Sequence, residues 1–93
     1  MVANCSEAEG EPDVQVFPNP FHNDLTIHME NFGGTTVSIE VYDMLGRIVM
    51  QKTIGVDGSS EETMLQLDNL SNGTYNVRIS TKELVTNKQV VKN

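Results

Sequence analysis

This chain is poor in the residue types that most often carry chemistry. Its 93 residues include one cysteine, two histidines, two tyrosines, three phenylalanines and no tryptophan. The lone thiol, Cys5, excludes an internal disulfide framework. No apolar run is long enough for a transmembrane helix, and no signal peptide is visible at the polar start. A secreted destination would therefore require that the chain be part of a longer protein.

Positive charge is also scarce. Six Lys and Arg residues stand against 13 Asp and Glu residues, which gives a formal net charge of −7 and a pI near 4.5. An acidic surface repels the phosphates of nucleic acids and the anionic surface of a membrane. We therefore expect a soluble chain that binds no nucleic acid.

The sequence contains no recognisable catalytic or metal-binding constellation. Nucleophilic catalysis needs a nucleophile, a base and an orienting group that converge, and the two histidines mark no such triad. His22 and His28 would lie about 20 Å apart on a regular strand, too far to share one ion even with Asp24 between them. The acidic segment 57–62 lacks the alternating ligand spacing of a calcium loop. The sequence predicts no enzyme, no cofactor, no metal and no small-molecule substrate.

What the chain does contain is a series of short segments with a period of two. Apolar and polar residues alternate, or β-branched residues cluster, in segments 14–17, 25–29, 37–42, 48–53, 64–67, 75–79 and 84–91. Such strands, with turn signals about every 8–12 residues, are typical of an antiparallel sandwich. We predict an acidic flexible linker over residues 1–13. One domain over residues 14–93 then forms an all-β, seven-stranded antiparallel immunoglobulin-like β-sandwich.

Turn and corner signals separate these segments. Pro18 and Pro20 lack the N–H groups that a strand needs, so they end the first strand. Gly46 is suited to a positive φ in a short hairpin. Residues 55–62 are predicted to form a long polar loop. Tyr75 starts a strand after a crossing between sheets, where a tyrosine corner is expected.

Four motifs follow one another from Phe17 to Asn93. They are Pro18-Asn19-Pro20, Val41-Tyr42-Asp43-Met44-Leu45-Gly46-Arg47, Gly73-Thr74-Tyr75-Asn76-Val77-Arg78-Ile79, and a basic β-branched stretch from Lys88 to Lys92. In this order, they make the chain resemble the type A C-terminal sorting domain of the type IX secretion system of Bacteroidota, the Por secretion tail family.

This resemblance implies a non-enzymatic signal at the tail of a larger cargo protein. The cargo would pass through the periplasm and cross the outer membrane through the type IX translocon, to be attached at the cell surface or released. In the family, a sortase-like peptidase usually removes the tail and attaches the cargo, and it is the second expected partner. The domain itself is expected to be a monomer or a weak dimer formed through edge strands.

The candidate contact residues lie in the basic end, on an otherwise acidic domain. Our hypothesis is that the translocon grips the last strand through Lys88, Val90, Val91 and Lys92, by strand addition. Because this strand ends the sequence, we expect it to be loosely held. The other family-motif residues are expected to be mainly structural: Pro18, Asn19, Pro20, Leu45, Gly46, Arg47, Gly73 and Tyr75.

A second function remains open from the sequence. The chain could be a generic immunoglobulin-like or fibronectin-like accessory domain of a surface protein, acting as a spacer or binding carbohydrate. Sugar binding usually needs an exposed aromatic platform. Tyr42 beside Phe17 or Phe21 would be required to form it.

Overall fold

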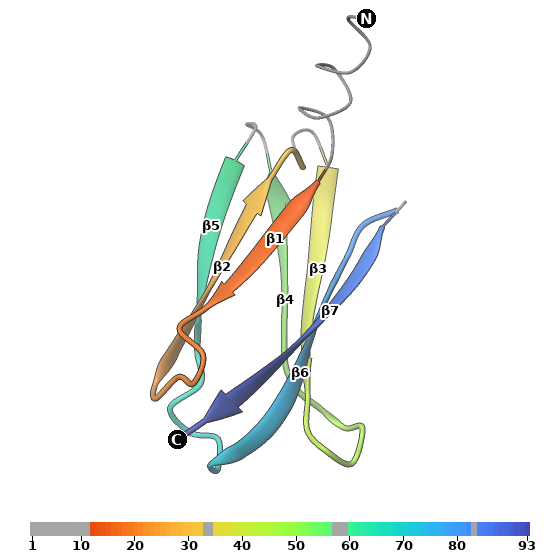
Figure 1. Cartoon of the computed structure of the whole chain (residues 1–93). Helices are drawn as coiled ribbons and strands as arrows, with labels where there is room; N and C mark the ends of the chain where they lie inside the picture. The colour runs from red at the N-terminus through yellow and green to blue at the C-terminus, as the bar shows by residue number, and fades with distance from the viewer. Residues whose placement is uncertain (1–11, 33–34, 57–59, 83) are drawn as a thin grey trace, which may run out of the picture.

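The chain folds into two antiparallel sheets, and no helix occurs in the described part (Figure 1). This computed structural model describes residues 12–32, 35–56, 60–82 and 84–93; residues 1–11 of the expected linker, with Cys5, lie outside them. No described helix could cross a membrane. The strands are β1 (Asp13–Phe17), β2 (Asp24–Glu30), β3 (Thr35–Tyr42), β4 (Ile48–Val56), β5 (Ser60–Gln66), β6 (Gly73–Ser80) and β7 (Val85–Lys92).

The predicted all-β class is confirmed, the described residues form seven strands, and one loop prediction is wrong. Residues 55–62 are not one long polar loop, because β4 continues to Val56 and β5 begins at Ser60. Ser60 pairs with Glu30, and Glu62 pairs with His28. Backbone pairing along β2 holds residues 60–62 extended, although their composition favours a loop.

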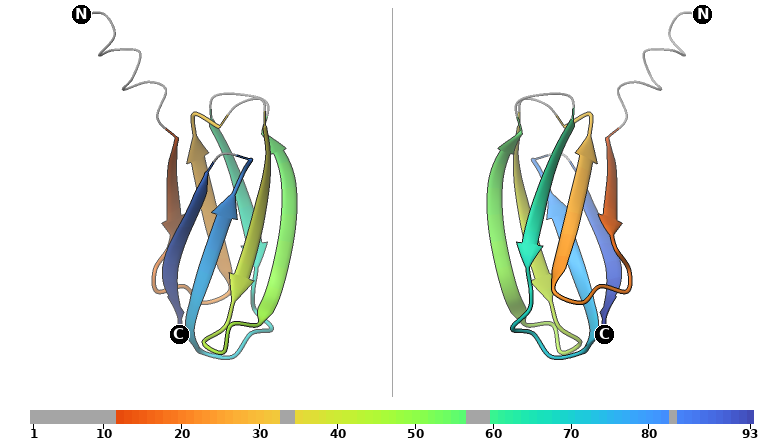
Figure 2. Two further views of the ribbon diagram at one scale, coloured as in Figure 1. Left: turned by 90° about the vertical axis from the view of Figure 1, so that its right-hand side faces the viewer. Right: turned by 90° about the vertical axis from the view of Figure 1, so that its left-hand side faces the viewer.

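The sheets stack face to face with the apolar residues between them (Figure 2). One sheet has the order β1-β2-β5, which we call the three-stranded sheet, and the other has β4-β3-β6-β7, which we call the four-stranded sheet. Alternate residues of each strand point inward, which is the arrangement of a sandwich with two wet outer faces. The buried residues of the three central strands are Leu25, Ile27, Met29, Val37, Ile39, Val41, Tyr75, Val77 and Ile79.

The connection from β5 to β6 crosses from one sheet to the other and carries the predicted tyrosine corner. The Tyr75 ring is buried, and its hydroxyl donates a hydrogen bond of 2.6 Å to the backbone oxygen of Ser71. The hydroxyl thereby satisfies a carbonyl in the crossing segment. The corner holds β6 against the core, and β6 in turn pairs along its length with β7.

A lysine links the edge strands β4 and β5 across the sandwich. Lys52 on β4 pairs with the buried Ile39, so its side chain lies on the inner side of the sheet. Its Nζ donates to Thr63 Oγ1 at 2.8 Å and to the backbone oxygen of Met64 at 3.4 Å. The apolar stem of Lys52 can pack near the core while its ammonium group bonds the opposite edge.

Candidate functional site

The segment that follows β1 leaves the three-stranded sheet and runs beside β7. We call residues 19–22 the strap. Both peptide bonds before Pro18 and Pro20 are cis, and Phe21 then forms an isolated parallel bridge with Lys92 of β7. Figure 1 shows the loop after β1 at the same end of the sandwich as the tip of β7. The strap therefore joins the edge strands of the two sheets.

Backbone hydrogen bonds fix the strap to the last residues of the chain. The N–H of Phe21 donates to the backbone oxygen of Val91 at 2.8 Å. The N–H of Asn93 donates to the backbone oxygen of Phe21 at 2.9 Å. Phe21 thus bonds on both sides of Lys92, as one residue of a parallel strand does.

Side chains of the strap add three further contacts. Asn19 Oδ1 accepts a hydrogen bond from the N–H of Val91 at 3.0 Å, and Asn19 Nδ2 donates to the backbone oxygen of Gln89 at 3.2 Å. His22 Nδ1 lies 3.0 Å from the backbone oxygen of Asn93. The expectation that the last strand is loosely held is therefore wrong.

Two buried side chains lie at the junction of strap and strand. Phe21 is fully buried, although it stands in a polar loop, and Lys92 is only 7% exposed. Sequence reasoning missed the role of Phe21. A single aromatic residue between Pro-Asn-Pro and three polar residues was the available signal, because a solvated loop gives such a ring nothing to pack against.

The predicted contact residues of β7 are split between the two sides of the strand. Val90 and Lys92 are buried on the core side, and Lys88 pairs with the buried Val77 and is half-buried. Only Val91 lies on the exposed side. In the folded domain, the two basic side chains therefore do not project freely from the strand.

The motif of residues 41–47 builds the turn between β3 and β4. Asp43 Oδ1 accepts hydrogen bonds from the backbone N–H groups of Leu45 and Arg47 at 2.9 and 3.0 Å, and Asp43 Oδ2 accepts one from Arg47 Nε at 2.8 Å. The backbone closes the turn between Asp43 and Arg47, and Gly46 has φ of 84°. The hydrogen bond from the Arg47 backbone is the main cause that lowers the pKa of Asp43.

Leu45 differs from the expectation of a structural side chain. It is 78% exposed, and Met44 beside it is 69% exposed. Gly46 has a positive φ in the turn, Arg47 bonds Asp43, and Gly73 opens β6 with φ of 154°; the structural role expected of these residues stays a prediction. The fold uses the backbone of Leu45 but not its side chain. Two large apolar residues inside a turn are the sequence signal that could have predicted this exposed tip.

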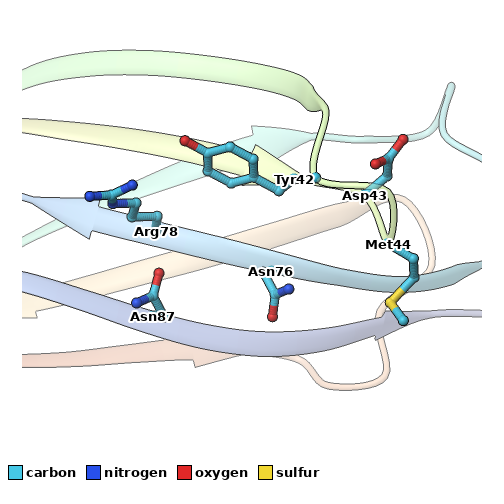
Figure 3. A pocket seen from close by; sticks show the side chains of 7 residues that line it. Tyr42, Asp43, Met44, Asn76, Arg78 and Asn87 are labelled. Atoms are coloured by element: carbon cyan, nitrogen blue, oxygen red, sulfur yellow. The ribbon is translucent and has the colours of Figure 1, made fainter.

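A shallow depression lies beside this turn on the outer face of the four-stranded sheet. Its volume is about 530 Å³, and its lining consists of Tyr42, Asp43, Met44, Gly46, Asn76, Arg78 and Asn87. The labelled side chains in Figure 3 arise from the turn and from β3, β6 and β7. The Tyr42 hydroxyl donates to Glu40 Oε1 at 2.7 Å, and Gln51 Nε2 donates to Glu40 Oε2 at 3.3 Å.

The outer face of the three-stranded sheet carries a histidine between two carboxylates. His28 Nε2 lies 3.1 Å from Glu30 Oε2, and His28 Nδ1 lies 3.0 Å from Glu62 Oε2. The Glu30 hydrogen bond is the main cause that raises the pKa of His28. In the described ranges, no group of three or more His, Cys, Asp or Glu side chains could hold a metal ion.

Tyr42, Phe17 and Phe21 do not form the aromatic platform that carbohydrate binding would need. Phe21 is fully buried in the junction with β7. Tyr42 is half-buried and bonded to Glu40 on the four-stranded sheet, whereas Phe17 lies on β1 in the other sheet. In the described residues, these three aromatic side chains therefore do not favour carbohydrate binding.

Comparison with known proteins gives one family. Residues 15–93 match the family described as the secretion system C-terminal sorting domain. No curated protein matches the chain. The matched range contains most of β1 and all of the other six strands, and it includes the strap, the turn at Asp43 and the end of β7.

Proposed function

Because this chain belongs to the family of secretion system C-terminal sorting domains, we propose that it directs a larger cargo across the outer membrane through the type IX secretion system. The family implies a C-terminal sorting signal and a secreted or cell-surface cargo. The observation that carries the proposal is the extent of the match, which takes in both sheets of the domain. The family is not a catalytic one, and the chain acts by being recognised.

The proposed route has two partners. The cargo passes through the periplasm, engages the translocon through its tail, and is then attached at the surface or released. A sortase-like peptidase cuts before the domain in the attached case. The family resemblance supports both steps, and the acidic segment over residues 1–13 is the corresponding place on this chain.

The fold supports this reading as an immunoglobulin-like sandwich. Its three-plus-four strand arrangement and the hydroxyl of Tyr75 bonded to Ser71 are the supporting features. In such a sandwich the last strand is an edge, and β7 has β6 as its one neighbouring strand in the sheet order. Edge strands expose backbone groups to which another strand can be added.

The residues proposed to be read are Lys88, Val90, Val91 and Lys92 of β7. Val90 and Lys92 face the core and the strap bonds this end of the strand, so their side chains become accessible only when the end of β7 separates from both the core and the strap. The basic residues would then meet the translocon as an extended peptide. Two motifs of the family, Pro18-Asn19-Pro20 and the basic end, lie side by side. This placement supports a link between release of β7 from the strap and recognition of its basic residues.

The test is export of a reporter. The full chain is fused to the end of a fluorescent protein that carries a signal peptide, and it is expressed in a bacterium with a type IX system. We expect fluorescence at the surface or in the medium. We expect the fusion to be retained in the periplasm when residues 84–93 are deleted or when the translocon is inactivated. Equal export of the deleted fusion would refute the proposed signal.

A further inference from the structure

We propose that the exposed tip of the β3–β4 turn, Met44 and Leu45, is a docking element for a protein of the translocation machinery. The partner would provide an apolar pocket bordered by carboxylates. This inference rests on the proposed function and adds a second contact surface to it. It concerns side chains outside β7.

The turn is built so that it holds these two side chains outward. Asp43 receives two backbone N–H groups and the Arg47 guanidinium, and Gly46 supplies the positive φ that closes the turn. The side chains of Asp43 and Arg47 thus fix the backbone of the turn. Leu45 and Met44, the most exposed large apolar residues in the described part, contribute little to the core.

Two exposed arginines flank the tip. The Arg47 side chain is 72% exposed although its Nε bonds Asp43, whose own side chain is only 15% exposed. Arg78 is exposed on the sheet beside the turn, and Glu40 there accepts hydrogen bonds from Tyr42 and Gln51. On a chain of net charge −7, these two guanidinium groups suit an acidic rim on a partner.

The adjoining depression favours a protein over a lipid surface. Met44 lines it together with the amides of Asn76 and Asn87, the Tyr42 ring and the Arg78 guanidinium (Figure 3). Amide groups on a sheet face are directional donors and acceptors that a protein backbone or side chain can match. A fluid lipid surface offers no such fixed partners, and the net negative charge of the chain opposes binding to anionic lipids.

The experiment compares substitutions on opposite faces of the same domain. Met44→Ser with Leu45→Ser removes the apolar tip, and Arg78→Gln removes the neighbouring charge. Met64→Ser is the matched control, because Met64 is 52% exposed on β5 of the other sheet. Each variant is measured for its melting temperature and for export of the reporter fusion.

The tip variant is expected to keep its melting temperature within about 2 °C, because both side chains are exposed. Its export is expected to fall at least about tenfold, as for loss of a central apolar anchor, and Arg78→Gln is expected to give a smaller fall. Met64→Ser is expected to be exported normally. A photo-crosslinking residue at position 45 is expected to attach to a translocon protein, and one at position 64 is not.

Four outcomes would overturn the inference. Normal export of the tip variant beside an exported wild type would refute it while leaving the proposed function intact. Binding of the wild-type chain, but not the tip variant, to phosphatidylglycerol vesicles would assign the tip to a membrane. If the wild-type chain self-associates and the tip variant does not, the tip contacts a second copy of the chain. Failure of the wild-type fusion to be exported would overturn the proposed function and this inference together.

Discussion

Asn19 holds Val91 across 72 residues of sequence: its side-chain oxygen accepts the backbone N–H of Val91 at 3.0 Å. The same amide donates to the backbone oxygen of Gln89 at 3.2 Å. One side chain thus occupies two backbone groups on the edge of β7. The first recognised motif of the chain and the proposed address at its end are therefore parts of one structural unit.

Substitution Asn19→Ala should loosen the end of β7. It removes two solvent-accessible hydrogen bonds, so the free energy of unfolding should fall by about 1–2 kcal/mol. Hydrogen exchange measured by NMR should show faster exchange of the Val91 amide. Asn69→Ala, at an exposed position between β5 and β6, is the control and should leave that amide unchanged. Unaltered exchange at Val91 in Asn19→Ala would mean that the strap does not restrain the strand.

Phe21 should be one of the most sensitive positions in the domain. It is fully buried, so Phe21→Ala should lower the free energy of unfolding by about 3–5 kcal/mol through lost burial and the cavity left behind. Phe17→Ala is the matched control at a 41% exposed position and should cost about 1 kcal/mol. Urea denaturation measures both. Equal costs would show that Phe21 does not anchor the strap in the core.

The tyrosine corner should contribute through its hydroxyl as well as its ring. Tyr75→Phe keeps the ring and removes the 2.6 Å bond to Ser71, which should cost about 1–2 kcal/mol. Tyr42→Phe removes a bond to Glu40 on the outer face and should cost less than Tyr75→Phe. If urea denaturation gives no loss for Tyr75→Phe, the ring alone forms the corner.

The His28 contacts should make a small part of the stability pH-dependent. Its pKa is raised above the ordinary value of 6.5, chiefly by the hydrogen bond to Glu30. The folded state therefore favours the protonated ring, and this contribution is fully present below the unfolded pKa and lost as pH rises through the raised folded pKa. An NMR titration should show the His28 pKa fall in Glu30→Gln and stay unchanged in Glu40→Gln, on the opposite sheet. A His28 pKa that Glu30→Gln does not lower would contradict this assignment.

The strands could be predicted because their information is local. Alternation in segments such as 25–29 and 37–42 indicates both the strand and the face that is buried. Residues 60–62 could not be recognised as part of a strand, because a polar stretch becomes extended only through pairing with β2. Tertiary pairing outweighs local composition there.

The candidate site was harder to predict, because its key contacts join residues that are distant in sequence. Nothing near Asn19 or Phe21 indicates that they bond β7. The charge of Lys92 usually implies exposure, yet this residue is only 7% exposed where it bridges to Phe21. For Leu45, family motif membership indicated a structural role, whereas its position in the turn leaves the side chain in solvent.

The central claim is that the basic residues of β7 form the sorting address. Lys88→Met with Lys92→Met removes both charges while keeping side chains of similar length, so the fold should be retained and its melting temperature checks this. Lys82→Met, in the exposed connection before β7, removes one lysine charge outside β7 and is the control. The readout is the fraction of reporter fusion that reaches the cell surface or medium. We expect the double variant to stay in the periplasm while Lys82→Met is exported like the wild type; normal export of a folded double variant would show that the two lysines are not the address.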